Sequence, residues 1–202
     1  MEKKSKGSIF IVSAPSGAGK TTLCRQIIST VDSIRPSVSF TTRQPRSGEI
    51  PDMDYCFVTE NEFKEMIDRG DFVEWARVHG NLYGTSRRKL EEIIAAGYDA
   101  LLDIDTQGAG QIKKSFHNAV YIFILPPSMK ELKVRLENRM SNSAEDMNRR
   151  LRRAVDEIRE YKMYDYVIVN DILETSLKKL EAVITAERLR STKIDPQWIE
   201  NI

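Results

Sequence analysis

The chain has 202 residues, of which 41% are hydrophobic and 30% charged, and its formal net charge is +1. These values suit one domain with a sizeable core, and the balanced charge provides no general field that would draw it onto nucleic acid or a membrane. We therefore expect neither partner. The two cysteines are far apart, which favours a reducing compartment over a disulfide framework. The apolar stretch near the start is too short for a signal peptide or a membrane span, so we expect a cytoplasmic location.

The first expected element is a buried strand from Ile9 to Ser13, because its apolar run does not alternate. A glycine-rich loop follows, and Leu23 to Val31 predicts a helix. Strand, glycine loop and helix in this order hold phosphates, since backbone N–H groups and the positive end of the helix face one point. Lys20 can reach terminal phosphates, and the hydroxyl of Thr21 can ligate Mg²⁺. The alternative is an ordinary glycine-containing turn. The strict pattern starts with glycine where this chain has Ala14, which fits only if its φ angle is not positive.

A β-rich insertion is expected next, and it interrupts the alternation of strands and helices. Such an insertion is a natural place for a second substrate. Arg43 and Arg46 lie there in a polar loop limited by Pro45, and two guanidinium groups suit phosphate oxygens. The alternative is a pair of solvated surface arginines. The expected elements are strands at Asp54–Val58 and Asp71–Val78, helices at Glu62–Arg69 and Arg87–Ala96, and a turn at Gly80–Thr85.

Buried strands return after the insertion, and carboxylates mark the end of the first one. Asp103 and Asp105 follow its apolar residues, a position from which an aspartate orients Mg²⁺ near a phosphate loop. A carboxylate there can also cap the next helix, expected near Gly108. Capping suits Asp105 better than Asp103, so both roles remain open. The later elements expected are strands at Ala119–Leu125 and Tyr166–Val169 and a helix from Leu173 to about Arg190.

Two arginine-rich helices are expected between these last strands. The first begins with a capping box at Ser128 and runs to about Met140, and Arg135 and Arg139 share one of its faces. A polar break then leads to a second helix with arginines in its first turns, Arg150 among them. The pair could close over bound phosphates as a lid. It could also form a solvated helical hairpin.

Several separated motifs together resemble the guanylate kinase family of the bacterial type, from about Gly7 to Arg190. Alanine at the first loop position is common among bacterial members, so Ala14 agrees with the resemblance. The turn Met140–Ser143 departs from the Gly-Thr-like turn of the family, which affects the placement of Arg139. The motifs are Ser13–Thr21, Ser39–Arg46, Asp54–Tyr55, Glu74–Trp75, Tyr83–Thr85, Asp103–Asp105 and Ile168–Asp171.

The resemblance implies an α/β fold of the P-loop NTPase type, with a three-layer core around a parallel sheet, a β-rich GMP-binding insertion and a helical lid. A single guanylate-kinase-like domain would cover residues 1–202. Its implied parts are the core at 7–35, 87–126 and 160–190, the GMP-binding subdomain at 36–86, the lid at 127–159 and a polar tail at 191–202.

The implied activity is direct phosphoryl transfer from Mg-ATP to GMP, and also to dGMP, which gives GDP from GMP. The residues implied to bind ATP are Ala14, Pro15, Ser16, Gly17, Ala18, Gly19, Lys20, Thr21 and Thr22. Those implied to bind GMP are Ser39, Arg43, Arg46, Tyr55, Glu74, Tyr83, Thr85 and Asp105. Those implied in catalysis are Lys20, Arg43, Arg135, Arg139 and Arg150, and those implied to hold Mg²⁺ are Thr21 and Asp103.

These implied roles agree with the chemistry of guanine, which presents N1–H and N2–H₂ as donors to the two oxygens of Glu74. Adenine presents an acceptor at N1 and has no N2 amino group, so we expect it to be rejected. No general base is needed, because the acceptor phosphate is already ionised at neutral pH. Two alternatives remain: a non-catalytic guanylate-kinase-like module that binds phosphopeptides, and a related kinase for a phosphorylated sugar. A homo-oligomer is also left open, with Trp198 in the tail as the hint of a contact.

Overall fold

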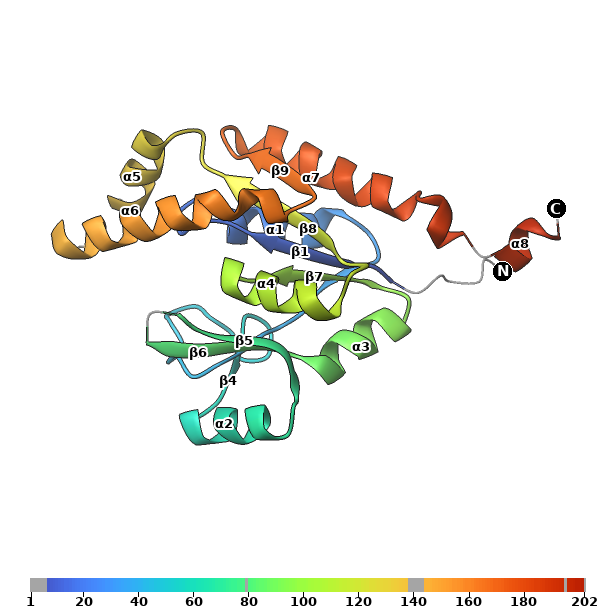
Figure 1. Ribbon diagram of the computed structural model, residues 1–202, viewed down its shortest axis with the longest axis horizontal. Helices are drawn as coiled ribbons and strands as arrows, with labels where there is room; N and C mark the ends of the chain where they lie inside the picture. The colour runs from blue at the N-terminus through green and yellow to red at the C-terminus, as the bar shows by residue number, and fades with distance from the viewer. Residues whose placement is uncertain (1–6, 79, 138–143, 195, 202) are drawn as a thin grey trace.

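The computed structural model describes residues 7–78, 80–137, 144–194 and 196–201. At its centre lies a parallel sheet of five strands (Figure 1), which are β1 (Ile9–Ser13), β2 (Ile34–Pro36), β7 (Asp99–Asp103), β8 (Val120–Leu125) and β9 (Tyr166–Val169). Their order is β2-β7-β1-β8-β9. The inner strands β1 and β8 are buried along almost their whole length, as expected when helices cover both faces of a parallel sheet.

Helices on both faces of this sheet give the core three layers. They are α1 (Lys20–Thr30) and α7 (Leu173–Arg188) on one face and α3 (Arg87–Ala95) and α4 (Thr106–Ser115) on the other. Phe10 and Val12 of β1 pack with the first pair, and Ile9 and Ile11 pack with the second. Successive side chains of a strand point to opposite faces, so the unbroken apolar run of β1 serves both layers. The expected three-layer α/β fold is confirmed.

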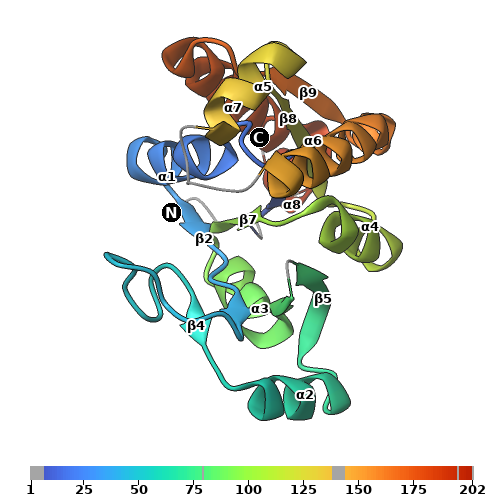
Figure 2. The same cartoon turned by 90° about the vertical axis from the view of Figure 1, so that its left-hand side faces the viewer.

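A smaller sheet lies beside the core, below it in Figures 1 and 2. Its elements are β3 (Phe40–Thr41), β4 (Cys56–Phe57), β5 (Phe72–Val78) and β6 (Asn81–Ser86), with helix α2 (Glu60–Asp68) packed on them. The strand order is β4-β3-β6-β5, antiparallel except for the β3–β4 pair. Phe63 of α2 stacks on Phe72 with the ring centres 4.5 Å apart. This small core holds β5 and β6 next to the main sheet.

Two further helices, α5 (Met129–Glu137) and α6 (Ala144–Arg159), lie on the other side of the core from the smaller sheet (Figures 1 and 2). They pack on each other through Leu132, Leu136 and Ala154. The remaining short helices are η1 (Glu160–Met163), η2 (Ser191–Lys193) and α8 (Pro196–Ile199). In the described part of the chain, no helix combines the length and apolar character needed to cross a bilayer.

Two parts of the sheets differ from the sequence-based expectation. The predicted turn at Gly80–Thr85 is wrong, because β6 pairs there with both β5 and β3. A Cβ on Gly84 would lie 2.9 Å from Cδ1 of Phe72, so this glycine allows close packing within a strand and does not mark a turn. Strand β2 was not expected, and its last residue, Pro36, pairs with Leu101 in the core sheet although the sequence assigned it to the insertion.

Candidate functional site

The loop between β1 and α1 curls because two of its glycines adopt left-handed conformations. Gly17 and Gly19 both have a φ of 92°, which other residues rarely adopt. A Cβ on Gly19 would also lie 2.4 Å from Nδ2 of Asn170. Ala14 is not among the described non-glycine residues with a positive φ, so alanine fits the first loop position. A loop of this shape directs backbone N–H groups toward a bound phosphate.

Asn170, directly after β9, supports this loop. Its Nδ2 donates a hydrogen bond to the carbonyl oxygen of Ala18 at 2.7 Å, and its own carbonyl oxygen accepts one from Arg135 at 3.2 Å. Asn170 and Ala18 are both buried, so losing the Asn170 side chain would leave the carbonyl oxygen of Ala18 without this hydrogen-bond partner. Sequence reasoning included Asn170 in a family motif but gave it no role. The available signal was a polar residue at the carboxyl end of a buried strand.

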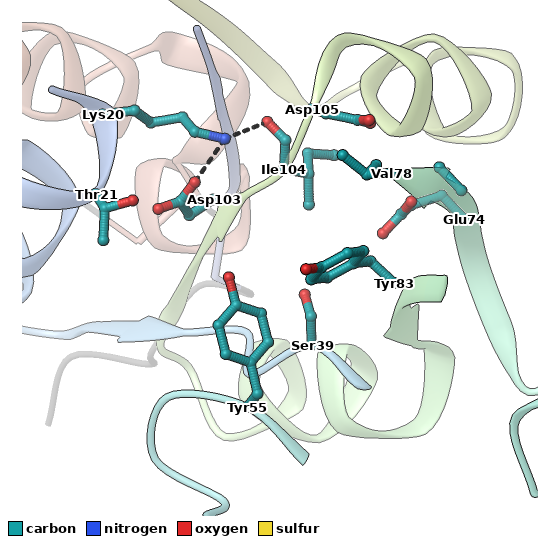
Figure 3. Close-up of a pocket in the computed structure, with 11 residues that line it drawn as sticks. Lys20, Thr21, Ser39, Tyr55, Glu74, Val78, Tyr83, Asp103, Ile104 and Asp105 are labelled. Carbon is teal, nitrogen blue, oxygen red and sulfur yellow. Dashed lines mark hydrogen bonds and ion pairs between the residues drawn. The ribbon is translucent and has the colours of Figure 1, made fainter. Parts of the chain in front are cut away.

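Lys20, the first residue of α1, points to the carboxyl end of the neighbouring strand β7 (Figure 3). Its Nζ lies 2.6 Å from Oδ1 of Asp103 and donates to the carbonyl oxygen of Ile104 at 2.6 Å. Burial lowers the pKa of Lys20, but the adjacent Asp103 carboxylate outweighs this and raises the pKa above its ordinary value. The ammonium group is therefore charged at neutral pH. Thr21 lies beside the same carboxylate (Figure 3).

A cavity next to Lys20 brings together side chains from the core and the smaller sheet. Its lining residues are Lys20, Thr21, Ser39, Tyr55, Glu74, Ala76, Val78, Tyr83, Asp103, Ile104 and Asp105 (Figure 3). A second cavity lies over the phosphate loop and shares Lys20, Thr21, Val78 and Asp105 with the first. The two cavities therefore adjoin at the lysine, an arrangement that suits a phosphate donor next to a phosphate acceptor.

Glu74 is the buried acid of the first cavity. Its side chain comes from β5, and its Oε1 accepts a hydrogen bond of 2.6 Å from the hydroxyl of Thr85 on β6. Burial, opposed in part by that hydrogen bond, raises the pKa of Glu74 from 4.5 to about 7. Gly108 of α4 leaves space for the carboxylate, since a Cβ there would lie 2.5 Å from Oε2. Gly108 was not singled out as a site residue, because this proximity joins elements far apart in the sequence.

Asp105 caps α4 and also faces the cavity. Its Oδ1 accepts a hydrogen bond from the backbone N–H of Gly108 at 2.9 Å, as the capping alternative expected. Its Oδ2 is buried and has no hydrogen-bond partner among the described residues. One oxygen is thus used for structure, and the other is available to a ligand.

The arginines of the insertion differ in their placement. Arg43 is 12% exposed, its Nη2 lies 2.8 Å from Oε1 of Glu49, and its guanidinium carbon lies 5.3 Å from the ring centre of Tyr55. The side chain of Arg46 is exposed, and its backbone N–H donates to Oε2 of Glu49 at 2.7 Å. Neither arginine is among the residues lining the first cavity. Glu49, which sequence reasoning did not single out, is the counter-ion that holds Arg43 here.

The arginines of α5 and α6 approach the phosphate loop from the other side. Nη2 of Arg150 donates to Oγ of Ser16 at 3.0 Å, and Arg135 contacts Asn170 as described above. Arg139 lies outside the described residues. Arg153, which was not among the predicted site residues, lines the cavity over the loop. Its helical spacing from Arg150 was the signal that could have identified it.

The parallel α/β core, the phosphate loop and the adjoining acidic cavity define a P-loop protein that handles phosphorylated ligands. The family model for guanylate kinase matches residues 6–187. A guanylate kinase of Geobacter metallireducens is 52% identical over 191 residues, which cover 95% of this chain and 94% of that relative. The guanylate kinase of Escherichia coli K12 is 50% identical over 190 residues, with 93% and 92% covered. The crystal structure of guanylate kinase from Anaplasma phagocytophilum matches with a TM-score of 0.79 and 37% identity, covering 94% of this chain and 90% of that one. This chain belongs to the guanylate kinase family.

Proposed function

We propose that the chain transfers the γ-phosphoryl group of ATP to a phosphate oxygen of GMP, and also of dGMP, with ADP as the leaving group. The observation that carries this proposal is that Lys20 of the phosphate loop and the buried Glu74 line one cavity. A donor phosphate at the loop and a GMP molecule whose guanine lies at Glu74 would then share one cavity. In this assignment residues 36–86 bind GMP, residues 127–159 act as the lid, and the rest forms the core and tail.

Guanine is read by Glu74 and Asp105 in this proposal. The ionised Glu74 carboxylate accepts hydrogen bonds from N1–H and N2–H₂ of guanine. Oδ2 of Asp105, which has no hydrogen-bond partner among the described residues, accepts a further hydrogen bond from the base. Thr85 donates to Glu74 and so fixes the direction of its carboxylate. An adenine ring would present its N1 acceptor to the buried Glu74 carboxylate and has no N2 amino group, and such a site discriminates by about 10⁴-fold or more. Ser39 is well placed to serve the edge of the base, since it lines the same cavity.

The GMP phosphate would be held by Arg43, Arg46 and the hydroxyls of Tyr55 and Tyr83. Both tyrosines line the cavity, with ring centres 5.9 Å apart. Arg43 would exchange Glu49 for the phosphate, which offers its guanidinium a matching pair of charged oxygens. Arg46 would have to turn inward from its exposed position, so GMP binding would order this loop.

On the ATP side, the residues from Ala14 to Thr22 would surround the β- and γ-phosphates, with Lys20 as the charged group. The hydroxyl of Thr21 and the carboxylate of Asp103 are oxygen donors of the kind that Mg²⁺ prefers. Among the described residues no group of three or more His, Cys, Asp or Glu could hold a metal ion, which fits an ion held chiefly by phosphates and water. When bound, Mg²⁺ neutralises charge on the transferring phosphoryl group.

Catalysis in this site would consist of positioning and charge stabilisation. The GMP phosphate has a second pKa of about 6, so its oxygen is already an effective nucleophile. Lys20, Arg135, Arg139 and Arg150 would stabilise the negative charge that develops between donor and acceptor. Closing α5 and α6 over the loop would exclude water and so suppress ATP hydrolysis.

ADP formation from Mg-ATP with a panel of acceptors would test the proposal. We expect turnover with GMP and dGMP and none above background with AMP, UMP or a ribose bisphosphate, because only guanine satisfies Glu74. Turnover with the base-free acceptor would favour the sugar-phosphate kinase. GMP binding without any turnover would instead favour a non-catalytic binding module.

The raised pKa of Glu74 predicts that GMP binding depends on pH near neutrality. Below about 7 the free site is mostly protonated, and a neutral carboxyl cannot accept from both guanine donors. We therefore expect the KM for GMP to rise as pH falls, by up to about tenfold per pH unit. Steady-state kinetics from pH 5.5 to 9 would measure this, with Glu74→Gln as the control. In the Glu74→Gln control the GMP phosphate still titrates, but the rise in KM for GMP below about pH 7 should be lost. The same dependence of KM on pH in both proteins would contradict the role of Glu74 in binding guanine.

A further inference from the structure

Arg153 lies between the two substrate sites and has no role in the mechanism above. It is three residues after Arg150 on α6, so the two arginines share a helix face. That face meets the phosphate loop, where Arg150 contacts Ser16 and Arg153 lines the overlying cavity together with Lys20 and Asp105. The guanidinium of Arg153 therefore adjoins both the loop and the guanine site.

Two carboxylates hold Arg153 in this position. Its Nε lies 2.9 Å from Oε1 of Glu157 on the same helix, and its Nη2 lies 3.8 Å from Oδ2 of Asp105. The first contact is a hydrogen-bonded ion pair, and the second is too long to be a hydrogen bond. The buried Oδ2 of Asp105 has no hydrogen-bond partner in the described part of the chain. The positive charge of Arg153 thus offsets the negative charge of this oxygen, but Arg153 does not donate a hydrogen bond to it.

We propose that Arg153 couples the two sites by exchanging Asp105 for the phosphates of ATP. This inference rests on the proposed function, in which Asp105 contacts guanine and the loop holds ATP. Guanine donors would occupy Oδ2 of Asp105 and release the guanidinium to the phosphates. Bound ATP would in turn draw Arg153 away and leave Oδ2 to guanine. Coupling of this kind is reciprocal, so each substrate raises the affinity for the other by the same factor.

The relative strengths of the contacts favour this exchange. The side chains of Arg153 and Asp105 are 31% and 21% exposed, and an ion pair with this separation and exposure is weak. A guanidinium on phosphate oxygens makes paired, charge-assisted hydrogen bonds, which are the stronger kind. Glu157 keeps the guanidinium near the loop in either arrangement, because it binds Nε and leaves the outer end to change partner.

Calorimetric titration of a non-hydrolysable ATP analogue with Mg²⁺, with and without saturating GMP, would measure the coupling. We expect GMP to tighten analogue binding to the wild type by about 5-fold to 100-fold. In Arg153→Gln this factor should fall close to one, while GMP alone binds at least as tightly as to the wild type. Arg152→Gln removes the same charge from the exposed neighbouring position and should keep the wild-type factor.

Arg153→Lys provides a second variant, which keeps the charge without the planar fork and should give an intermediate factor. A wild-type factor in Arg153→Gln would overturn the proposal. A factor of one in the wild type, with both ligands bound, would overturn it as well. Failure of the wild type to bind GMP at all would contradict the proposed function itself, so the two kinds of failure are distinguishable. Retained GMP binding by Arg153→Gln serves as the check that the variant is folded.

Discussion

Replacing Lys20 with methionine is expected to lower kcat for GMP phosphorylation by on the order of 10³-fold. The lysine ammonium is a positively charged group that lines both cavities, where negative charge develops during phosphoryl transfer. Methionine keeps much of the side-chain volume and removes the charge. Coupled measurement of ADP formation at saturating ATP and GMP would determine the change. A variant that keeps kcat within about tenfold of the wild type would contradict a catalytic role.

The same substitution removes the partner of Asp103, so stability has to be separated from chemistry. The two side chains are 18% and 32% exposed, and a carboxylate left unpaired there should lower the free energy of unfolding by about 1–3 kcal/mol. The double variant Lys20→Met with Asp103→Asn has no unpaired charge, and we expect it to regain stability. It should not regain turnover. Recovery of kcat in the double variant would mean that the loss in Lys20→Met came from misfolding.

The core and the phosphate loop were predictable because their signals are local. Residues Ile9 to Thr21 carry the strand, both glycines and the lysine in one continuous stretch, and the buried strands at Leu101 and Ile122 are plain apolar runs. The family resemblance added the expected roles of residues in the insertion. Those roles do not depend on correct secondary structure, so Tyr83 and Thr85 were singled out although their strand was predicted as a turn.

Contacts between distant segments were not predictable from these patterns. Strand β2 exists because its three residues pair with β7, which no local signal indicates. Gly108 matters because it leaves space for Glu74, and Glu49 because it holds Arg43. Arg153 was one of several arginines in its helix. Its spacing from Arg150 places both on one helix face, but only the folded arrangement shows that Arg153 lies beside Asp105.

Replacing Glu74 with glutamine is expected to lower kcat/KM for GMP by on the order of 10³-fold. Glutamine has nearly the same shape, but its amide group presents donors to the N1–H or N2–H₂ donors of guanine. The loss should appear mainly in kcat/KM for GMP, with the affinity for ATP alone unchanged. Thr85→Val is the matched control: it keeps the carboxylate and removes only its hydroxyl partner, so its effect should be smaller. A Glu74→Gln enzyme as active as the wild type would contradict the reading of guanine by this residue.

The same variant should be more stable than the wild type at alkaline pH. The unfolded chain ionises Glu74 near 4.5, whereas in the folded protein burial raises the pKa to about 7. The wild type therefore loses unfolding free energy as pH rises between these two values, while a glutamine is unaffected. At about 1.4 kcal/mol per pH unit, the difference should reach about 3–3.5 kcal/mol above pH 8 and fall below about 1 kcal/mol near pH 5. Urea unfolding of both proteins at the two pH values would measure it. An equal difference at both pH values would mean that burial does not raise the pKa of Glu74. Keeping this carboxylate ionised for guanine recognition would then cost the folded protein no stability.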